Sequence, residues 1–307
     1  MSGAPSAPPA GVGARGAVIA GVACYTLWGV LPIYLHAVAA AGAGPMEVIA
    51  HRALWSVPWA GLLVLLARQG RQSLDVLKTP RTLALLALSA LLIAGNWTLY
   101  VWAVSQGRLL EGSLGYYINP LMNMAAGAIL FRERLDLVGW GAIALAALGV
   151  GVQALALGHP PYISLTLALT FTCYGLIRKQ VLADAQTGLF VECLVLAAPA
   201  MAYIVWLERT GAGHFLGHVQ PTLLLLLAGP VTVVPLMLFA WAARRLPLST
   251  IGFLQFIGPT LQFLIGVEGG ESLTPLRAAS FGFIWAGVAV FAFGAWRKTR
   301  GLRPNPA

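Results

Sequence analysis

The sequence predicts an all-α membrane protein with ten transmembrane helices arranged as two inverted five-helix repeats. Three observations lead to this fold class. The composition is 59% hydrophobic with a mean hydropathy of +0.80, apolar stretches of membrane-spanning length recur along the chain, and basic residues gather in alternate connections between them. An ordinary soluble domain balances its charged and apolar residues far more evenly.

Apolar stretches long enough to cross a bilayer begin near residue 16 and continue to residue 297. About 20 apolar residues suffice to span the hydrocarbon core as a helix. In chain order the candidate spans are 16–38, 46–67, 83–105, 111–131, 136–157, 160–181, 189–207, 221–242, 248–268 and 274–297. The first is preceded by Arg15 and resembles a signal peptide, but nine further spans follow, so we expect a retained helix.

The basic residues orient these spans. With the N-terminus inside, fifteen of the 19 Lys and Arg residues lie in cytoplasmic segments or at the span ends beside them, three lie on the other side in the same way, and Arg52 is left within a span. This asymmetry is the positive-inside pattern. It accounts for the net charge of +9 without a nucleic-acid partner. We therefore expect a multi-pass protein of the cell (inner) membrane with cytoplasmic N- and C-termini.

The two halves of the chain match each other at a shift of 139 residues. Asn119-Pro120 then falls on Gly258-Pro259, and Trp102-Ala103 falls on Trp241-Ala242. Because each half holds five spans, the second copy must enter the membrane from the opposite face. In transporters such inverted repeats place the binding site near the midplane between the halves. The predicted organisation is a disordered cytoplasmic tail (1–15), a first repeat (16–157), a second repeat (158–298) and a cytoplasmic tail (299–307).

Several longer motifs resemble one family. They are EVIAHRALWS (47–56), GNWTLYVWAV (95–104), LEGSLGYYINPLMN (110–123), AQTG (185–188) and LSTIGFLQFIGPTL (248–261). Together they are similar to the RarD branch of the drug/metabolite transporter superfamily, whose members contain two EamA-type domains. The resemblance runs from about residue 16 to residue 297. It implies ten transmembrane helices, an inner-membrane location and a permease function, and branch members are commonly labelled as chloramphenicol-sensitivity or resistance permeases.

Charged residues inside a span are the first candidates for function. A charge at the bilayer centre costs about 2.5–3.5 kcal/mol on insertion scales, so such residues usually face a cavity or a partner. Arg52 is interpreted as an anion or hydrogen-bond anchor for substrate, with snorkelling to the headgroups or a structural ion pair as open alternatives. Glu47 lies one turn before His51 and is expected to pair with it. His51 and Glu192 are the candidate proton-coupling groups.

Buried amides and aromatic residues form a second candidate set. Amides within a bilayer need partners because water is absent there, and aromatic walls with a few amides are typical of a pocket for a small, partly apolar molecule. The alternative is that these residues join helices or lie at the lipid interface. With Arg52, the predicted substrate-binding residues are Asn96, Trp97, Trp102, Tyr116, Tyr117, Asn119, Trp241, Gln255 and Phe256.

Pro120 and Pro259 are equivalent in the two halves and are predicted hinges. A proline removes a backbone donor and bends a helix, which frees a carbonyl one turn earlier. Paired interruptions of this kind are typical of a transport site or a gate, although a kink that only improves packing is the alternative.

The predicted function is secondary transport of a small, partly apolar organic metabolite or drug by alternating access, with export as the expected direction. The alternative is a channel or an assembly scaffold without active transport. No catalytic pattern is present, so no enzyme activity and no cofactor are expected. His214 and His218 are four residues apart but have no third ligand nearby, so no metal site is predicted. The expected partners are the substrate and membrane lipid, without nucleic acid, and the oligomeric state stays open.

Overall fold

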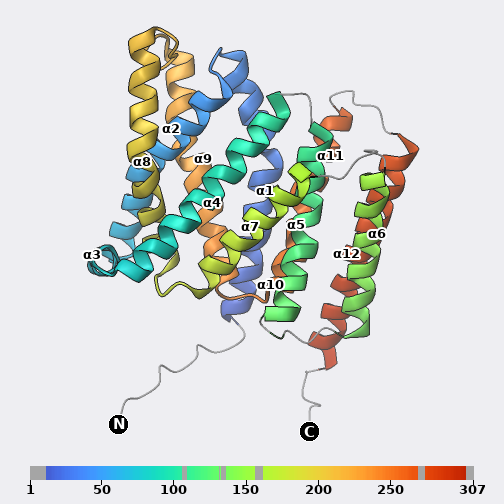
Figure 1. The fold of residues 1–307 in the computed structure, drawn as a ribbon. Coiled ribbons are helices and arrows are strands. Elements are labelled where there is room, and N and C mark those ends of the chain that lie inside the picture. The colour runs from blue at the N-terminus through green and yellow to red at the C-terminus, as the bar shows by residue number, and fades with distance from the viewer. Residues whose placement is uncertain are drawn as a thin grey trace, which may run out of the picture. The chain divides into compact units, whose positions relative to one another are not determined.

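A computed structural model describes residues 12–105, 109–130, 132, 136–155, 162–268 and 274–301, and these residues form helices and their connections without a strand (Figure 1). The helices are α1 (Val12–Ala40), α2 (Pro45–Leu66), α3 (Gly70–Lys78), α4 (Pro80–Ser105), α5 (Leu109–Leu130), α6 (Leu137–Leu155), α7 (Tyr162–Gln180), α8 (Ala185–Thr210), α9 (Val219–Ala243), α10 (Leu248–Gln255), α11 (Ile257–Glu268) and α12 (Pro275–Gly301).

The predicted spans all overlap helices, with three differences. The short helix α3 was not predicted, and the span 248–268 is divided at Phe256 into α10 and α11. Helix α1 begins at Val12, so the last residues of the predicted disordered tail 1–15 are helical. Residues 1–11 of that tail lie outside the described residues, as do residues 302–307 of the predicted C-terminal tail.

Five helices within the described residues are long and apolar enough to cross a membrane. They are α1, α2, α4, α8 and α9, and α6 and α12 contain shorter apolar stretches, Leu137–Val152 and Ala278–Gly294. Leucines at the end of α2 are exposed, with Leu65 and Leu66 both 72% accessible. An apolar surface of this kind needs a lipid surrounding rather than water. The chain is therefore an all-helical membrane protein.

The chain folds into two compact units that each combine segments from both halves of the sequence. Unit 1 comprises residues 1–98 and 173–246, and unit 2 comprises residues 99–172 and 247–307. Helices α4 and α7 each contribute to both units. Neither unit coincides with one of the predicted repeats, 16–157 and 158–298.

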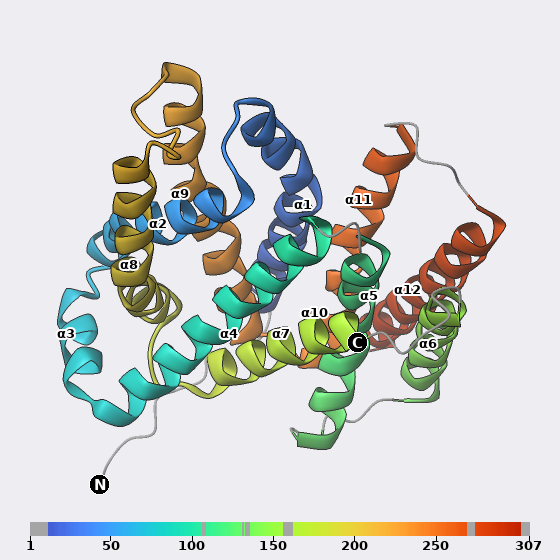
Figure 2. The ribbon, with the colours of Figure 1, turned by 45° about the horizontal axis from the view of Figure 1, so that its top comes forward.

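In unit 1, helix α2 packs against both α8 and α9, and α1 packs on α9 (Figure 2). The α2–α9 approach is close because Gly229 faces the backbone of Trp55. A Cβ at Gly229 would lie 2.8 Å from the Trp55 carbonyl carbon, a distance that real side chains do not tolerate. Farther along α9, the rings of Tyr25 and Tyr174 pack on Phe239 with centroids 6.5 and 5.8 Å away.

In unit 2, α6 packs along α12 (Figure 1), and α5 packs on α10. Glycines make these approaches possible: a Cβ at Gly149 would lie 2.7 Å from the Ser280 carbonyl oxygen, and a Cβ at Gly252 would lie 2.7 Å from that of Pro120. The Ser280 hydroxyl donates to the Gly149 carbonyl at 2.8 Å. Small residues and hydroxyl bonds are the usual basis of close helix contacts in membranes.

Candidate functional site

A small cavity in unit 1 lies between α2, α4, α8 and α9. Its volume is about 50 Å³, which is room for a few water molecules. Its lining is largely apolar but includes two charged side chains, Arg52 and Glu192. The residues around it are Ile49, Arg52, Ala53, Ser56, Ile93, Ala94, Trp97, Leu189, Glu192, Cys193, Leu196, Thr232 and Leu236.

Arg52 points into the protein and is only 5% exposed. Its Nε donates to the Thr232 hydroxyl at 2.9 Å, and that hydroxyl donates in turn to the Ala228 carbonyl at 2.7 Å. The guanidinium carbon lies 3.6 Å from the centroid of the Trp97 ring, in the geometry of a cation–π contact. Arg52 is thus directed into the protein, where its contacts include a hydroxyl and an indole face.

Glu192 is 3% exposed and is held by two side chains. The Ser89 hydroxyl donates to its Oε1, and the Arg178 Nη1 lies 3.5 Å from the same oxygen. Arg178 is itself 1% exposed and donates through Nη2 to the Ala185 carbonyl at 2.9 Å. A buried carboxylate needs such a partner, because an isolated charge pays the full cost of losing water.

Gly188 leaves the space that Arg178 occupies. A Cβ at Gly188 would lie 2.9 Å from the guanidinium carbon and would overlap Nη1. Arg178 is one of the basic residues counted as cytoplasmic in the charge distribution, and its side chain is buried against α8. Two signals were available in the sequence: Glu192 in an apolar span requires a cation, and the glycine one turn before it makes room for one.

The Glu47–His51 pair predicted from helix spacing is not a hydrogen-bonded pair, because both side chains have other hydrogen-bond partners. Glu47 instead accepts two hydrogen bonds from the α8–α9 connection, one from the His214 backbone N–H at 2.7 Å and one with the His214 Nδ1 at 2.9 Å. His51 Nδ1 accepts from the Trp55 indole at 2.9 Å, and its ring packs on Phe215 with centroids 4.9 Å apart. A backbone donor and an imidazole together satisfy a carboxylate better than one neighbour on the same helix. His51 is buried but does not line the cavity.

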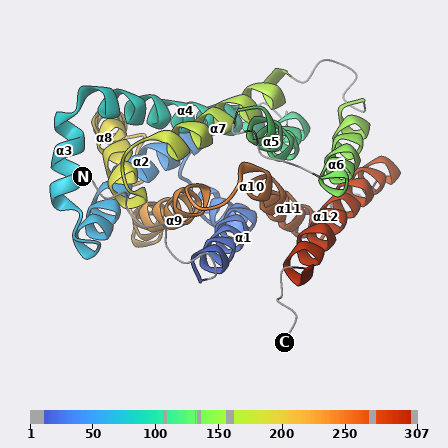
Figure 3. The same cartoon turned by 90° about the horizontal axis from the view of Figure 1, so that it is seen from below.

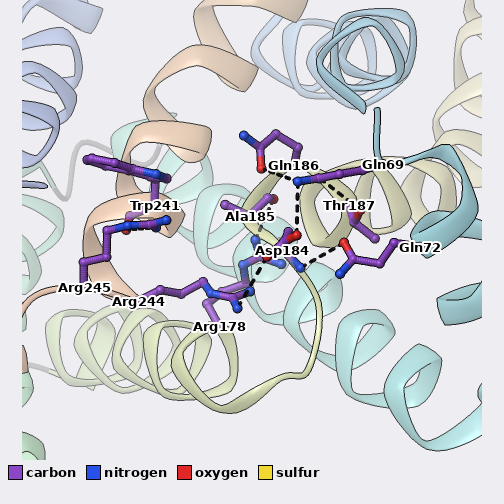
Figure 4. Close-up of polar contacts among 10 residues, drawn as sticks. All are labelled: Gln69, Gln72, Arg178, Asp184, Ala185, Gln186, Thr187, Trp241, Arg244 and Arg245. Atoms are coloured by element: carbon purple, nitrogen blue, oxygen red, sulfur yellow. Dashed lines mark hydrogen bonds and ion pairs between the residues drawn. The ribbon is translucent and has the colours of Figure 1, made fainter. Parts of the chain in front are cut away.

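The other predicted binding residues of unit 1, Asn96 and Trp241, lie on two of the helices that form the cavity but do not line it. Asn96 is 1% exposed on α4, directly before Trp97. Trp241 on α9 is covered by Arg245, whose guanidinium carbon lies 4.4 Å from the ring centroid. Figure 4 shows this stacked pair at the end of α9.

Five predicted residues of unit 2 lie within four positions of Pro120 or Pro259 along the chain: Tyr116, Tyr117, Asn119, Gln255 and Phe256. The Asn123 amide donates to Gln255 Oε1 at 2.7 Å, and the Tyr117 hydroxyl donates to the Pro259 carbonyl at 3.4 Å. Asn119 is fully buried, and neither atom of its amide has a hydrogen-bond partner among the described residues.

The helices that carry the prolines behave differently. Helix α5 continues through Pro120, whereas the helix before Pro259 is interrupted at Phe256, which is 2% exposed. The Tyr116 ring packs on Tyr100 at 5.0 Å. Trp102 is 44% exposed. The predicted binding set is thus divided: Arg52, Asn96, Trp97 and Trp241 belong to unit 1, and Trp102, Tyr116, Tyr117, Asn119, Gln255 and Phe256 belong to unit 2.

A polar cluster that the sequence did not predict joins the α2–α3 connection to the turn before α8 (Figure 4). Gln69 donates to Asp184 Oδ2 at 3.1 Å and accepts from the Thr187 hydroxyl at 3.2 Å. Asp184 lies 3.7 Å from Arg244 Nη2. Partial burial lowers the pKa of Arg244 below its ordinary value, and the neighbouring Asp184 carboxylate opposes this shift. The AQTG motif therefore forms the docking point for the end of α2.

Comparison with known proteins shows the family to which this chain belongs. The model of the EamA-like transporter family matches residues 15–154. An uncharacterized transporter of Vibrio cholerae is 43% identical over 281 residues, which cover 91% of this chain and 92% of the relative. Protein RarD of Escherichia coli is 40% identical over 283 residues, which cover 92% and 95%. The chain belongs to the RarD-type EamA transporters.

Two further similarities extend this assignment. A protein of Pseudomonas aeruginosa named chloramphenicol-sensitive protein RarD is 30% identical over 291 residues, covering 93% of this chain and 95% of the relative. A solved crystal structure with 20% sequence identity superposes with a TM-score of 0.67 over 89% of this chain and 96% of that one, which shows a shared fold. The chain is thus a permease-type membrane protein of the drug/metabolite transporter superfamily, a group of transporters rather than enzymes. Membership implies a small-molecule substrate and a lipid surrounding.

Proposed function

We propose that this permease exports a small, partly apolar organic solute across the inner membrane by alternating access. Its ten transmembrane helices would form two inverted repeats, 16–157 and 158–298, with both termini in the cytoplasm. The observation that carries the proposal is the cavity of unit 1, because it places a guanidinium, an indole face and a carboxylate along one largely apolar space. Such a lining suits a molecule with one polar group on an apolar body.

The size of the cavity supports a mechanism with moving helices. Sites for drug-sized molecules usually enclose at least about 300 Å³, far more than the 50 Å³ present here. A substrate can enter only if the helices around the cavity separate. Alternating access provides this separation, with Pro120 and Pro259 as the proposed hinges.

Arg52 is the proposed anchor for the polar group of the substrate. Its contact with Trp97 fixes the guanidinium plane, so a planar acceptor such as a carboxylate or amide could bind beside the same indole. Asn96, Trp102, Tyr116, Tyr117, Asn119, Trp241, Gln255 and Phe256 complete the proposed binding set. Of the two proton-coupling candidates we favour Glu192 over His51, because only Glu192 lines the cavity.

The substrate is best sought without assuming its identity. Metabolites inside and outside cells that contain or lack the protein would be compared by mass spectrometry, with chloramphenicol as a defined trial compound because one relative carries its name. We expect at least one solute to be depleted inside the cells that express the protein. A rate that rises linearly with concentration and never saturates would indicate a channel and contradict the proposal.

Substitution at Arg52 then tests the site. With flux normalised to folded protein, Arg52→Lys should reduce transport because a compact ammonium cannot reproduce the planar fork. Arg52→Ala should reduce it further, and Arg209→Ala serves as the matched control because Arg209 is exposed at the end of α8. Full flux with Arg52→Ala would remove Arg52 from the transport site.

A further inference from the structure

Helix α3 is joined to two membrane-spanning helices by very short links. Three residues separate Leu66, the end of α2, from Gly70, the start of α3, and only Thr79 separates α3 from α4. An extended residue reaches at most about 3.6 Å. Because α2 and α4 both have the length and hydropathy of spans, α3 must remain at the membrane surface. In Figure 3 it is seen from the side, at the edge of unit 1.

One face of α3 is fixed against the protein. Ser73 and Val76 are 3% and 5% exposed. The Ser73 hydroxyl donates to the Gln69 carbonyl at 3.1 Å and lies 3.4 Å from the Thr187 hydroxyl. Val76 belongs to an apolar cluster with Leu86, Val181, Ala183 and Val191. These contacts determine which way the remaining faces of the helix point.

The exposed faces follow a regular order around the helix. Each residue advances by about 100°, so Leu74 and Leu77 lie together beside the buried face, and both are exposed, at 57% and 38%. Arg71 and Lys78 lie next to each other farther around, and Asp75 lies beyond them; all three are exposed. A helix in the plane of a membrane has this order, with apolar residues toward the acyl chains, basic residues at the phosphates and acidic residues toward water.

The charge around α3 complements an anionic surface. The exposed basic residues are Arg68, Arg71, Lys78 and Arg81, whereas Asp75 is the single acidic residue in the segment 67–82. A zwitterionic headgroup has no net charge for such a set to neutralise. Each basic residue near an anionic membrane contributes about a fivefold gain in affinity, which salt reduces.

We propose that α3 is a lipid-binding element that inserts Leu74 and Leu77 at the acyl boundary and binds anionic phospholipid headgroups with Arg71 and Lys78. The occupant of this surface is the leaflet that surrounds the protein. Because Gln69 and Ser73 contact the turn at Asp184 and Thr187, bound lipid also steadies the beginning of α8, which carries Glu192.

The test places one fluorescent reporter on α3 in the full-length protein. The three cysteines are replaced by alanine, Leu74→Cys is labelled with a nitrobenzoxadiazole dye, and the protein is reconstituted in nanodiscs of mixed phosphatidylcholine and phosphatidylglycerol. One sample contains brominated phosphatidylcholine and the other contains brominated phosphatidylglycerol, with the two lipids at equal mole fraction in both. Quenching of the dye by bromine then reports which of the two lipids lies next to α3. We expect brominated phosphatidylglycerol to quench at least threefold more strongly.

Two controls assign the preference to the basic residues. The double variant Arg71→Gln, Lys78→Gln should be quenched equally by the two lipids. High salt should have the same effect on the labelled protein that keeps Arg71 and Lys78. The salt experiment therefore tests the proposal even when the double variant does not fold. Arg209→Gln, at the other end of α8, should leave the preference intact. The proposal would be overturned by any of three results: equal quenching by the two lipids when Arg71 and Lys78 are present, water-like emission from the dye, or a lipid preference that survives both treatments.

Discussion

Substitution of Gly188 by alanine isolates the buried ion pair of unit 1. The added Cβ would lie 2.9 Å from the guanidinium carbon of Arg178 and would overlap its Nη1. The Arg178 guanidinium must then move, and a guanidinium that leaves Glu192 leaves the carboxylate with only the Ser89 hydroxyl. Leaving one partner of a buried pair uncompensated costs about 3–5 kcal/mol, and rotation of the arginine can recover part of this. We expect a net loss of about 2–4 kcal/mol.

The matched control is Gly95→Ala on α4, where a new Cβ meets nothing within 4 Å. There the alanine should be neutral or stabilise by about 0.5–1 kcal/mol, because glycine is a poor helix former. Both variants are compared by the apparent midpoint of thermal unfolding in detergent, followed by size-exclusion chromatography after heating at one fixed rate, since such unfolding is often irreversible. Equal midpoints for Gly188→Ala and Gly95→Ala would refute the assigned role of Gly188.

Three further outcomes follow from individual contacts. Glu47→Gln and His214→Ala should each lower the midpoint by an amount equivalent to about 1–2 kcal/mol, and the double variant should lose less than their sum because both remove one charge-assisted contact. Cysteines at Asp75 and Ala212, which are both exposed, should be labelled from opposite sides of the membrane by an impermeant reagent; labelling from one side would contradict the topology. Asn119→Leu should keep or raise stability, because its buried amide has no partner among the described residues. Transport flux should fall in this variant if Asn119 binds substrate. Full flux would show that Asn119 is not part of the binding site.

The helices were predictable because their signal is additive along the chain. Each predicted span sums the hydropathy of about twenty residues, so single polar residues such as Asn96 or Glu192 do not hide it. Helix α3 was missed for the same reason, since its nine residues are too few for that signal. Its alternation of buried, apolar and basic faces is readable only once the buried side is known. The interruption at Phe256 comes three residues before Pro259, within the turn that a proline disturbs.

Side-chain partners could not be predicted with the same reliability, and Glu47 shows why. Helix spacing offered His51 as its nearest neighbour, but the actual partner, His214, is 167 residues away in sequence. The pairing depends on how α2 meets the α8–α9 connection, and no local pattern specifies that meeting. Arg52 is buried in the protein, which is one of the placements that the sequence left open, and it avoids the cost of a charge in lipid. That its partners are Thr232 and Trp97 could not be derived from that cost.

Arg178 illustrates a limit of counting charges along the chain. The positive-inside tally assigns every basic residue near a span end to the water phase, yet Arg178, in the last turn of α7, is 1% exposed. The determining feature lies on another helix: Glu192 requires a cation, and Gly188 one turn earlier leaves space for it. In this chain, the buried Glu192 and the glycine one turn before it together form the pocket for the long side chain of Arg178. Arg178 therefore has a buried partner in addition to its place in the charge tally, which a count along the chain cannot reveal.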